Sequence, residues 1–150
     1  MEKIGTGDKT QMSRLLCRIE ENLPFGQVAE WDDELNSLPP ATAAVLVHAL
    51  HGWINTTQRI GYKSVPYQEY GLIDPEFWHR PRYDPTVLAL LNRGFLTSSG
   101  NGMSLGLTLK GAWCALQPTE YLAEILEEHH PEEVEQAVNF LLQAHNMNRL

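Results

Sequence analysis

Residues 95–109 combine a strand-like alternation with a glycine-rich turn, and this pattern limits the possible folds more than any other part of the chain. The segment 95–97 precedes a turn-forming stretch, Ser98-Ser99-Gly100-Asn101-Gly102. Leucines then alternate with small or polar residues, in the order Leu105, Gly106, Leu107, Thr108 and Leu109. A period of two is typical of a half-buried strand, so we expect an antiparallel hairpin here.

Helical periodicity covers much of the remaining chain, whose 150 residues are 43% apolar and can build a core. Apolar stripes predict helices over residues 10–23, 28–38 and 41–58, and the last, which is apolar over most of its circumference, is expected at the centre of the core. Another helix is predicted from Asp84-Pro85 to a capping Gly94. Further helices are expected over 110–116 and, as a helical hairpin interrupted at Pro131, over 118–148.

These elements predict a mainly α fold with a small β-hairpin. We expect a single domain over residues 1–150, with a winged-helix-like centre at 41–117. N-terminal helices within 1–40 and the C-terminal helical hairpin within 118–150 would flank this centre. The apolar stripes of the flanking helices need covering, either by the centre itself or by a second copy of the chain.

The order helix, loop, short helix, tight turn, helix, hairpin, helix is that of a winged helix-turn-helix domain, with the turn at residues 80–83. Within it, the segment 86–96 and the run Leu107-Thr108-Leu109-Lys110-Gly111 resemble bacterial winged-helix regulators of the MarR and PadR type. The resemblance covers about residues 41–117. It implies a recognition helix at residues 84–94, a wing after it and a homodimer made by the outer helices.

Few cations occupy the positions that a DNA-binding winged helix would use. The expected recognition helix carries only Arg93, and the wing over 95–109 has neither Lys nor Arg. Contacts to phosphates dominate DNA affinity, so two or three cations on a chain of net charge −8 predict weak binding. The alternative of a DNA-binding transcription regulator would rest on Lys63, Arg80, Arg82, Thr86 and Arg93, with Arg59 and Lys110 as further cations.

Two other features favour binding to a protein. Aromatic residues and arginines, which are enriched in interface hot spots, gather in residues 60–83; the candidates are Tyr67, Tyr70, Trp78, Arg80 and Arg82. An acidic helix face that could engage a basic partner carries Glu120, Glu124, Glu127 and Glu128. These features predict a non-enzymatic bacterial or phage regulator or inhibitor. In the alternative interpretation, the aromatic residues fill the core and the glutamates lie on a solvated helix face.

Histidines supply a third hypothesis, a His-ligated metal protein. His48 and His51 are three residues apart on a helix and share a face, and His79, His129, His130 or a carboxylate could complete a site. A partly hydrated helix face also explains this pair, and no known catalytic motif is present. We therefore expect no enzyme, no metal and no cofactor. We expect His129 and His130 at a helix end, and Cys17 and Cys114 buried in helices.

Composition limits the partners and the cellular location that we expect for the protein. With 11 Lys and Arg against 19 Asp and Glu, the chain should repel nucleic acid and anionic membranes. No run of about 18 apolar residues is present, which excludes a membrane-spanning helix. The polar residues 1–10 do not resemble a secretory signal, and the two cysteines form no C-x-x-C pair. We therefore expect a cytoplasmic protein.

Overall fold

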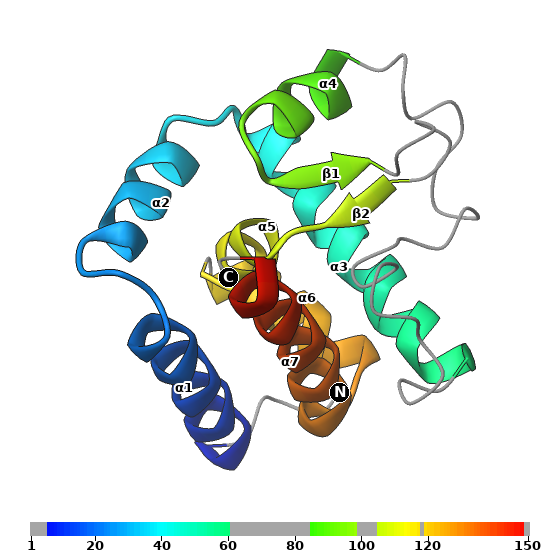
Figure 1. Cartoon of the computed structure of the whole chain (residues 1–150). Coiled ribbons are helices and arrows are strands. Elements are labelled where there is room, and N and C mark those ends of the chain that lie inside the picture. Colours follow the sequence, from blue (N-terminus) through cyan, green and yellow to red (C-terminus); the bar gives the residue numbers. More distant parts are fainter. Residues whose placement is uncertain (1–5, 61–84, 99–104, 118, 149–150) are drawn as a thin grey trace.

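Helices make up most of the fold, and one short antiparallel hairpin lies among them (Figure 1). The computed structural model describes residues 6–60, 85–98, 105–117 and 119–148. The predicted mainly α fold with a small β-hairpin is confirmed. The described elements are α1 (Thr6–Glu21), α2 (Gln27–Asn36), α3 (Pro40–Ile60), α4 (Pro85–Asn92), β1 (Leu96–Ser98), β2 (Leu105–Leu107), α5 (Leu109–Ala115), α6 (Thr119–Glu128) and α7 (Pro131–Asn148).

The long helix α3 forms the centre of the core, as its apolar sequence predicts. Its side chains Leu46, Leu50, Trp53 and Ile54 are fully buried. It contacts α4, β2, α5, α6 and α7, which surround it in Figure 1. The Trp53 indole N–H donates a hydrogen bond of 2.8 Å to the carbonyl of Ala137 in α7, so this central residue also ties the two helices together.

The N-terminal helix α1 packs against the C-terminal helix α7 (Figure 1). The stripe Met12, Leu15 and Ile19 is buried in the common core. At its edge Arg18 forms an ion pair with Glu135. The apolar stripe of α1 is therefore covered within a single chain.

The end of α4 directs the chain into the hairpin. Gly94 has φ +82°, the left-handed conformation that glycine adopts without a steric penalty. The Gly94 N–H donates a hydrogen bond of 3.2 Å to the Leu91 carbonyl, and the Phe95 N–H donates one of 3.0 Å to the Leu90 carbonyl. This pair of hydrogen bonds is the Schellman motif. The predicted glycine cap is confirmed.

The hairpin is held to α5 by Thr108. In the hairpin Leu96 pairs with Leu107 and Ser98 with Leu105. Just beyond β2, the Thr108 hydroxyl accepts the Gly111 N–H at 3.1 Å and lies 2.7 Å from the Gly94 carbonyl oxygen, to which it can donate. Thr108 thus caps α5 and fastens it to the end of α4.

None of the described helices is both long enough and apolar enough to cross a membrane.

Candidate functional site

The exposed face of α4, the helix that the winged-helix resemblance would use for recognition, is uncharged among the side chains that the structure describes. Val87 and Leu90 point into the core. The exposed residues recur at helical spacing and are Pro85, Leu88, Ala89 and Asn92. Leu88 is 42% exposed and is the largest exposed apolar side chain described on this helix. The described face offers apolar surface and one amide, and no cation for a phosphate.

Arg93, the cation at the end of α4, is directed toward neighbouring elements. Its guanidinium donates a hydrogen bond of 3.1 Å to the Ser37 hydroxyl at the end of α2, and it lies 5.9 Å from the centre of the Phe95 ring. Arg93 remains exposed, but part of its donor capacity is used within the chain. It thus bridges α4 and the end of α2.

Lys110, the cation after the hairpin, is engaged more completely. It forms an ion pair with Glu34 of α2, and its side chain is 15% exposed. The same amino group donates to the Arg93 carbonyl at 2.6 Å and lies 4.5 Å from the centre of the Phe95 ring. Lys110 therefore fixes α2, α4 and α5 to one another and is poorly placed to meet a nucleic acid.

The acidic residues predicted on the C-terminal hairpin lie on α6. Glu120, Glu124, Glu127 and Glu128 are all exposed, at a spacing that follows one side of the helix. Glu128 has a further contact, because one of its carboxylate oxygens lies 3.4 Å from Nδ1 of His51. The acidic face therefore reaches a buried histidine at its C-terminal end.

Most of the other predicted site residues lie outside the described residues. This holds for Lys63, Tyr67, Tyr70, Trp78, His79, Arg80 and Arg82, and for the predicted turn at 80–83. Thr86 lies in α4 and Arg59 lies in α3, but their side chains are not among those described.

Two histidines that are far apart in the sequence meet in the core. His51 of α3 and His129, which follows α6, place Nδ1 and Nε2 2.9 Å apart, and both residues are buried. Because an uncharged imidazole has one N–H and one free ring nitrogen, one ring donates and the other accepts. Burial lowers the pKa of both histidines below 6.5, with nearby glutamates acting in the opposite direction. The pair is therefore uncharged at neutral pH.

The turn between α6 and α7 fixes the position of His129. The backbone N–H of His129 donates a hydrogen bond of 3.0 Å to the Ile125 carbonyl, which closes the last turn of α6. Next to it, the His130 N–H is accepted at 2.8 Å by the Glu133 carboxylate, which caps the start of α7. Both hydrogen bonds orient the chain so that His129 points inward while His130 is exposed.

The alternative metal hypothesis joined His48 with His51, and that pairing stays a prediction. His48 is exposed and lies outside the cluster, whereas His51, Glu128 and His129 place ligand atoms within 4.8 Å of one another. The three-residue spacing put both histidines on one broad helix face, but that face crosses from the surface into the core. The sequence offers His129 only as one of several possible third ligands, since nothing near it in the sequence marks its approach to α3.

The prediction for the cysteines is half correct. Cys114 is buried, and its thiol lies 3.8 Å from the Trp31 carbonyl, to which it can donate. Cys17 is exposed. The stripe of α1 passes through Met12, Leu15 and Ile19, and Cys17 lies off it, so helical periodicity already indicated an exposed position.

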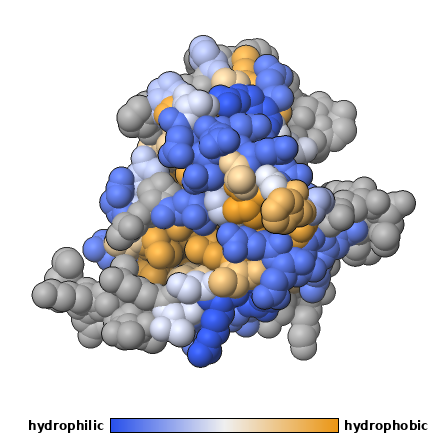
Figure 2. Space-filling view, turned by 90° about the vertical axis from the view of Figure 1, so that its left-hand side faces the viewer, coloured by the Kyte–Doolittle hydropathy of each residue, from blue (hydrophilic) through white to orange (hydrophobic). Residues whose placement is uncertain are grey.

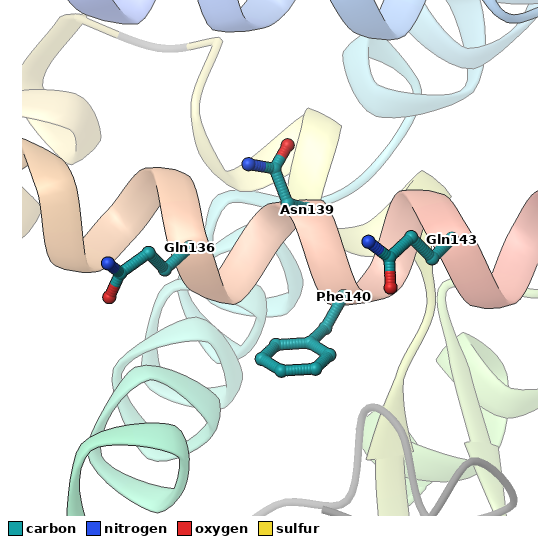
Figure 3. Close-up of a pocket in the computed structure, with 4 residues that line it drawn as sticks. All are labelled: Gln136, Asn139, Phe140 and Gln143. Atoms are coloured by element: carbon teal, nitrogen blue, oxygen red, sulfur yellow. The ribbon is translucent and has the colours of Figure 1, made fainter. Parts of the chain in front are cut away.

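A hollow of about 310 Å³ lies on α7, and its described lining is Gln136, Asn139, Phe140 and Gln143. Figure 3 shows these four side chains projecting from successive turns of the helix. Three amides and one aromatic ring can bind by hydrogen bonding and packing, but they supply neither a nucleophile nor a general acid or base.

The face of the molecule that carries α1 and α2 combines hydrophobic and hydrophilic areas. Figure 2 shows hydrophobic side chains gathered near the middle of this face, with hydrophilic ones around them. In the turn between the two helices Phe25 is fully exposed. Exposed apolar patches with polar rims are typical of protein–protein contact sites.

Comparisons with known protein families, with curated proteins and with solved structures found no match to the chain.

Proposed function

We propose that the protein is a non-enzymatic regulator or inhibitor that acts by binding another protein through a winged-helix-like scaffold. The observation that carries this proposal is the uncharged exposed face of α4, with Leu88 as its largest apolar side chain. A recognition helix that reads DNA needs hydrogen-bond donors and acceptors for base edges and cations for phosphates. An exposed leucine beside alanine and proline suits an apolar protein surface better.

The contacts that Lys110 and Arg93 make within the chain support the same proposal. Lys110 is paired with Glu34, and Arg93 is shared between Ser37 and the Phe95 ring. Freeing either cation for a phosphate would break contacts that hold α2 to the winged centre. The exposed glutamates of α6 add a surface that would attract a basic partner and repel nucleic acid.

A DNA-binding transcription regulator is the second candidate. The order α3, α4, hairpin and α5 favours it, because a winged helix has this arrangement. In this case Lys63, Arg80 and Arg82 would supply the phosphate contacts that the described face of α4 lacks.

Titration of the full chain with a generic DNA duplex at increasing salt distinguishes the two candidates. We expect no submicromolar binding at physiological salt. Submicromolar binding that weakens steeply with salt, and that is lost in Arg80→Ala/Arg82→Ala, would establish the regulator and contradict our proposal.

The surface of α4 is tested by capture of a partner on the immobilised protein from its native host. We expect a protein that is retained by the wild type and by Ser13→Asp, and released by Leu88→Asp. Ser13 is exposed on α1, so its variant controls for the added charge. A Trp78→Ala variant tests the aromatic segment in the same way. Retention that is equal in Leu88→Asp and Ser13→Asp would show that α4 is not the interface.

A further inference from the structure

Three side chains from two distant parts of the chain converge at the junction of α3 with the α6–α7 turn. His51 comes from the middle of α3, Glu128 is the last residue of α6, and His129 follows it in the turn before α7. His51 Nδ1 lies 2.9 Å from His129 Nε2 and 3.4 Å from a Glu128 carboxylate oxygen. The α4 face that carries the proposed function plays no part in this cluster, although Glu128 also belongs to the acidic face of α6.

Two of the three separations are close to those of a tetrahedral metal centre, and all three ligand atoms lie within 4.8 Å of one another. Bonds of about 2.0–2.1 Å at tetrahedral angles place ligand atoms about 3.3–3.4 Å apart. The separation between His51 and Glu128 already has this value. The two imidazole nitrogens would have to separate by about 0.4 Å, a small rotation of either ring.

The two imidazole rings present one nitrogen each to the other, with ring centres 5.1 Å apart, and a turn of the rings would direct both nitrogens at a shared ion. Their nitrogens face each other across one shared proton. When an ion takes the place of that proton, the donating ring moves its proton to its other nitrogen, and both rings stay uncharged. No net proton is released, and both free nitrogens become ligands.

The chemistry of the ligands selects the class of ion. Two imidazoles and one carboxylate favour zinc and its neighbours among the transition metals over magnesium or calcium, which prefer all-oxygen sites. The histidines are buried, whereas the Glu128 side chain is 63% exposed, so the cluster has a dry inner side and an outer side open to solvent. An ion can therefore enter past Glu128 and keep one water.

We propose that His51, Glu128 and His129 bind one divalent zinc ion, with water as the fourth ligand. The site departs from the expectation of no metal drawn from the sequence. Bound zinc would join α3 to the α6–α7 turn, and it would therefore stabilise the folded chain.

Zinc binding to the full-length, tag-free and chelator-treated protein tests this site. Isothermal titration with zinc chloride should give one ion per chain, and cobalt chloride should give the visible absorption of a tetrahedral centre. We expect Glu128→Gln, which alters an exposed side chain, to weaken zinc binding by at least about tenfold, because even the loss of an outer hydrogen-bond partner of a ligand costs that much. His51→Gln and His129→Gln should abolish stoichiometric binding.

Three matched variants serve as controls. His48→Gln, His130→Gln and Glu127→Gln alter neighbours of the same types that lie outside the cluster, and zinc affinity should be unchanged in each. Absence of stoichiometric binding in the wild type would overturn the proposal. So would binding that survives Glu128→Gln undiminished, or that is lost in His48→Gln or His130→Gln. Because Glu128→Gln leaves the core intact, the test holds even if a histidine variant fails to fold.

Discussion

A Cβ atom on Gly111 would lie 2.2 Å from the carbonyl oxygen of Phe95, so the first turn of α5 contacts the backbone that leads into β1. Helix propensity alone predicts that Gly111→Ala stabilises the protein by about 1 kcal/mol. We expect the opposite sign, a loss of about 1–3 kcal/mol in the free energy of unfolding, because backbone must move to admit the methyl group. Urea unfolding measures this change in the free energy of unfolding, and a Gly111→Ala variant more stable than the wild type would disprove the close packing.

Thr108 is expected to be the second determinant of the same junction. Thr108→Val keeps the shape of the side chain but removes the hydroxyl that caps Gly111 and reaches Gly94. We expect this variant to lose about 1–2 kcal/mol, the usual value of an N-cap. Thr108→Ser retains the oxygen and should lose less than half as much. Equal midpoints of chemical unfolding for the two variants would rule out the capping role.

Two buried tryptophans provide a matched comparison of hydrogen bonding. The Trp53 N–H is paired with the Ala137 carbonyl, whereas the Trp113 N–H has no hydrogen-bond partner within the described part of the chain. Replacement by Phe removes the same atoms at both positions. We expect Trp53→Phe to lose about 0.5–1.5 kcal/mol more than Trp113→Phe, because only the former breaks a buried hydrogen bond. Thermal unfolding of both variants provides the measurement, and a larger loss in Trp113→Phe would refute the assignment.

Cys114 should make the protein sensitive to alkali. Burial raises the pKa of its thiol from 9.0 to about 12. Between these two values the unfolded chain gives up a proton that the folded chain retains, so the stabilisation is complete below pH 9 and falls as the pH rises toward 12. The loss is at most about 1.4 kcal/mol per pH unit.

Unfolding free energies measured from pH 8 to 11 test this dependence. The alkaline slope should be shallower in Cys114→Ala than in the wild type. Cys17→Ala is the matched control, because Cys17 is exposed, and it should keep the wild-type slope. Identical slopes in all three proteins would mean that other groups cause the loss.

Local signals in the sequence were sufficient to predict most elements of the fold. The alternation from Leu105 to Leu109 predicted the hairpin, and Gly94 predicted the end of α4, because both depend on the conformation of a few neighbouring residues. Element ends shifted by a few residues: the helix predicted over 10–23 runs from Thr6 to Glu21. Such shifts are expected, since helix ends depend on weak terminal interactions.

Relationships between distant residues could not be predicted in this way. His51 and His129 are separated by 78 positions, and their contact depends on how α6 and α7 pack on α3. The engagement of Lys110 by Glu34 likewise requires α2 to lie beside α5. The sequence therefore indicated which residue types were available for a site, and tertiary packing determined which of them meet.

The packing of α1 on α7 has a consequence for synthesis of the protein. Arg18 and its partner Glu135 are 117 positions apart. A ribosome adds about 5–20 residues per second, so α1 emerges roughly 5–25 s before the helix that covers it. Throughout that interval the stripe Met12, Leu15 and Ile19 lacks the helix that covers it in the folded chain, so the packing of α1 is completed only after α7 has been made.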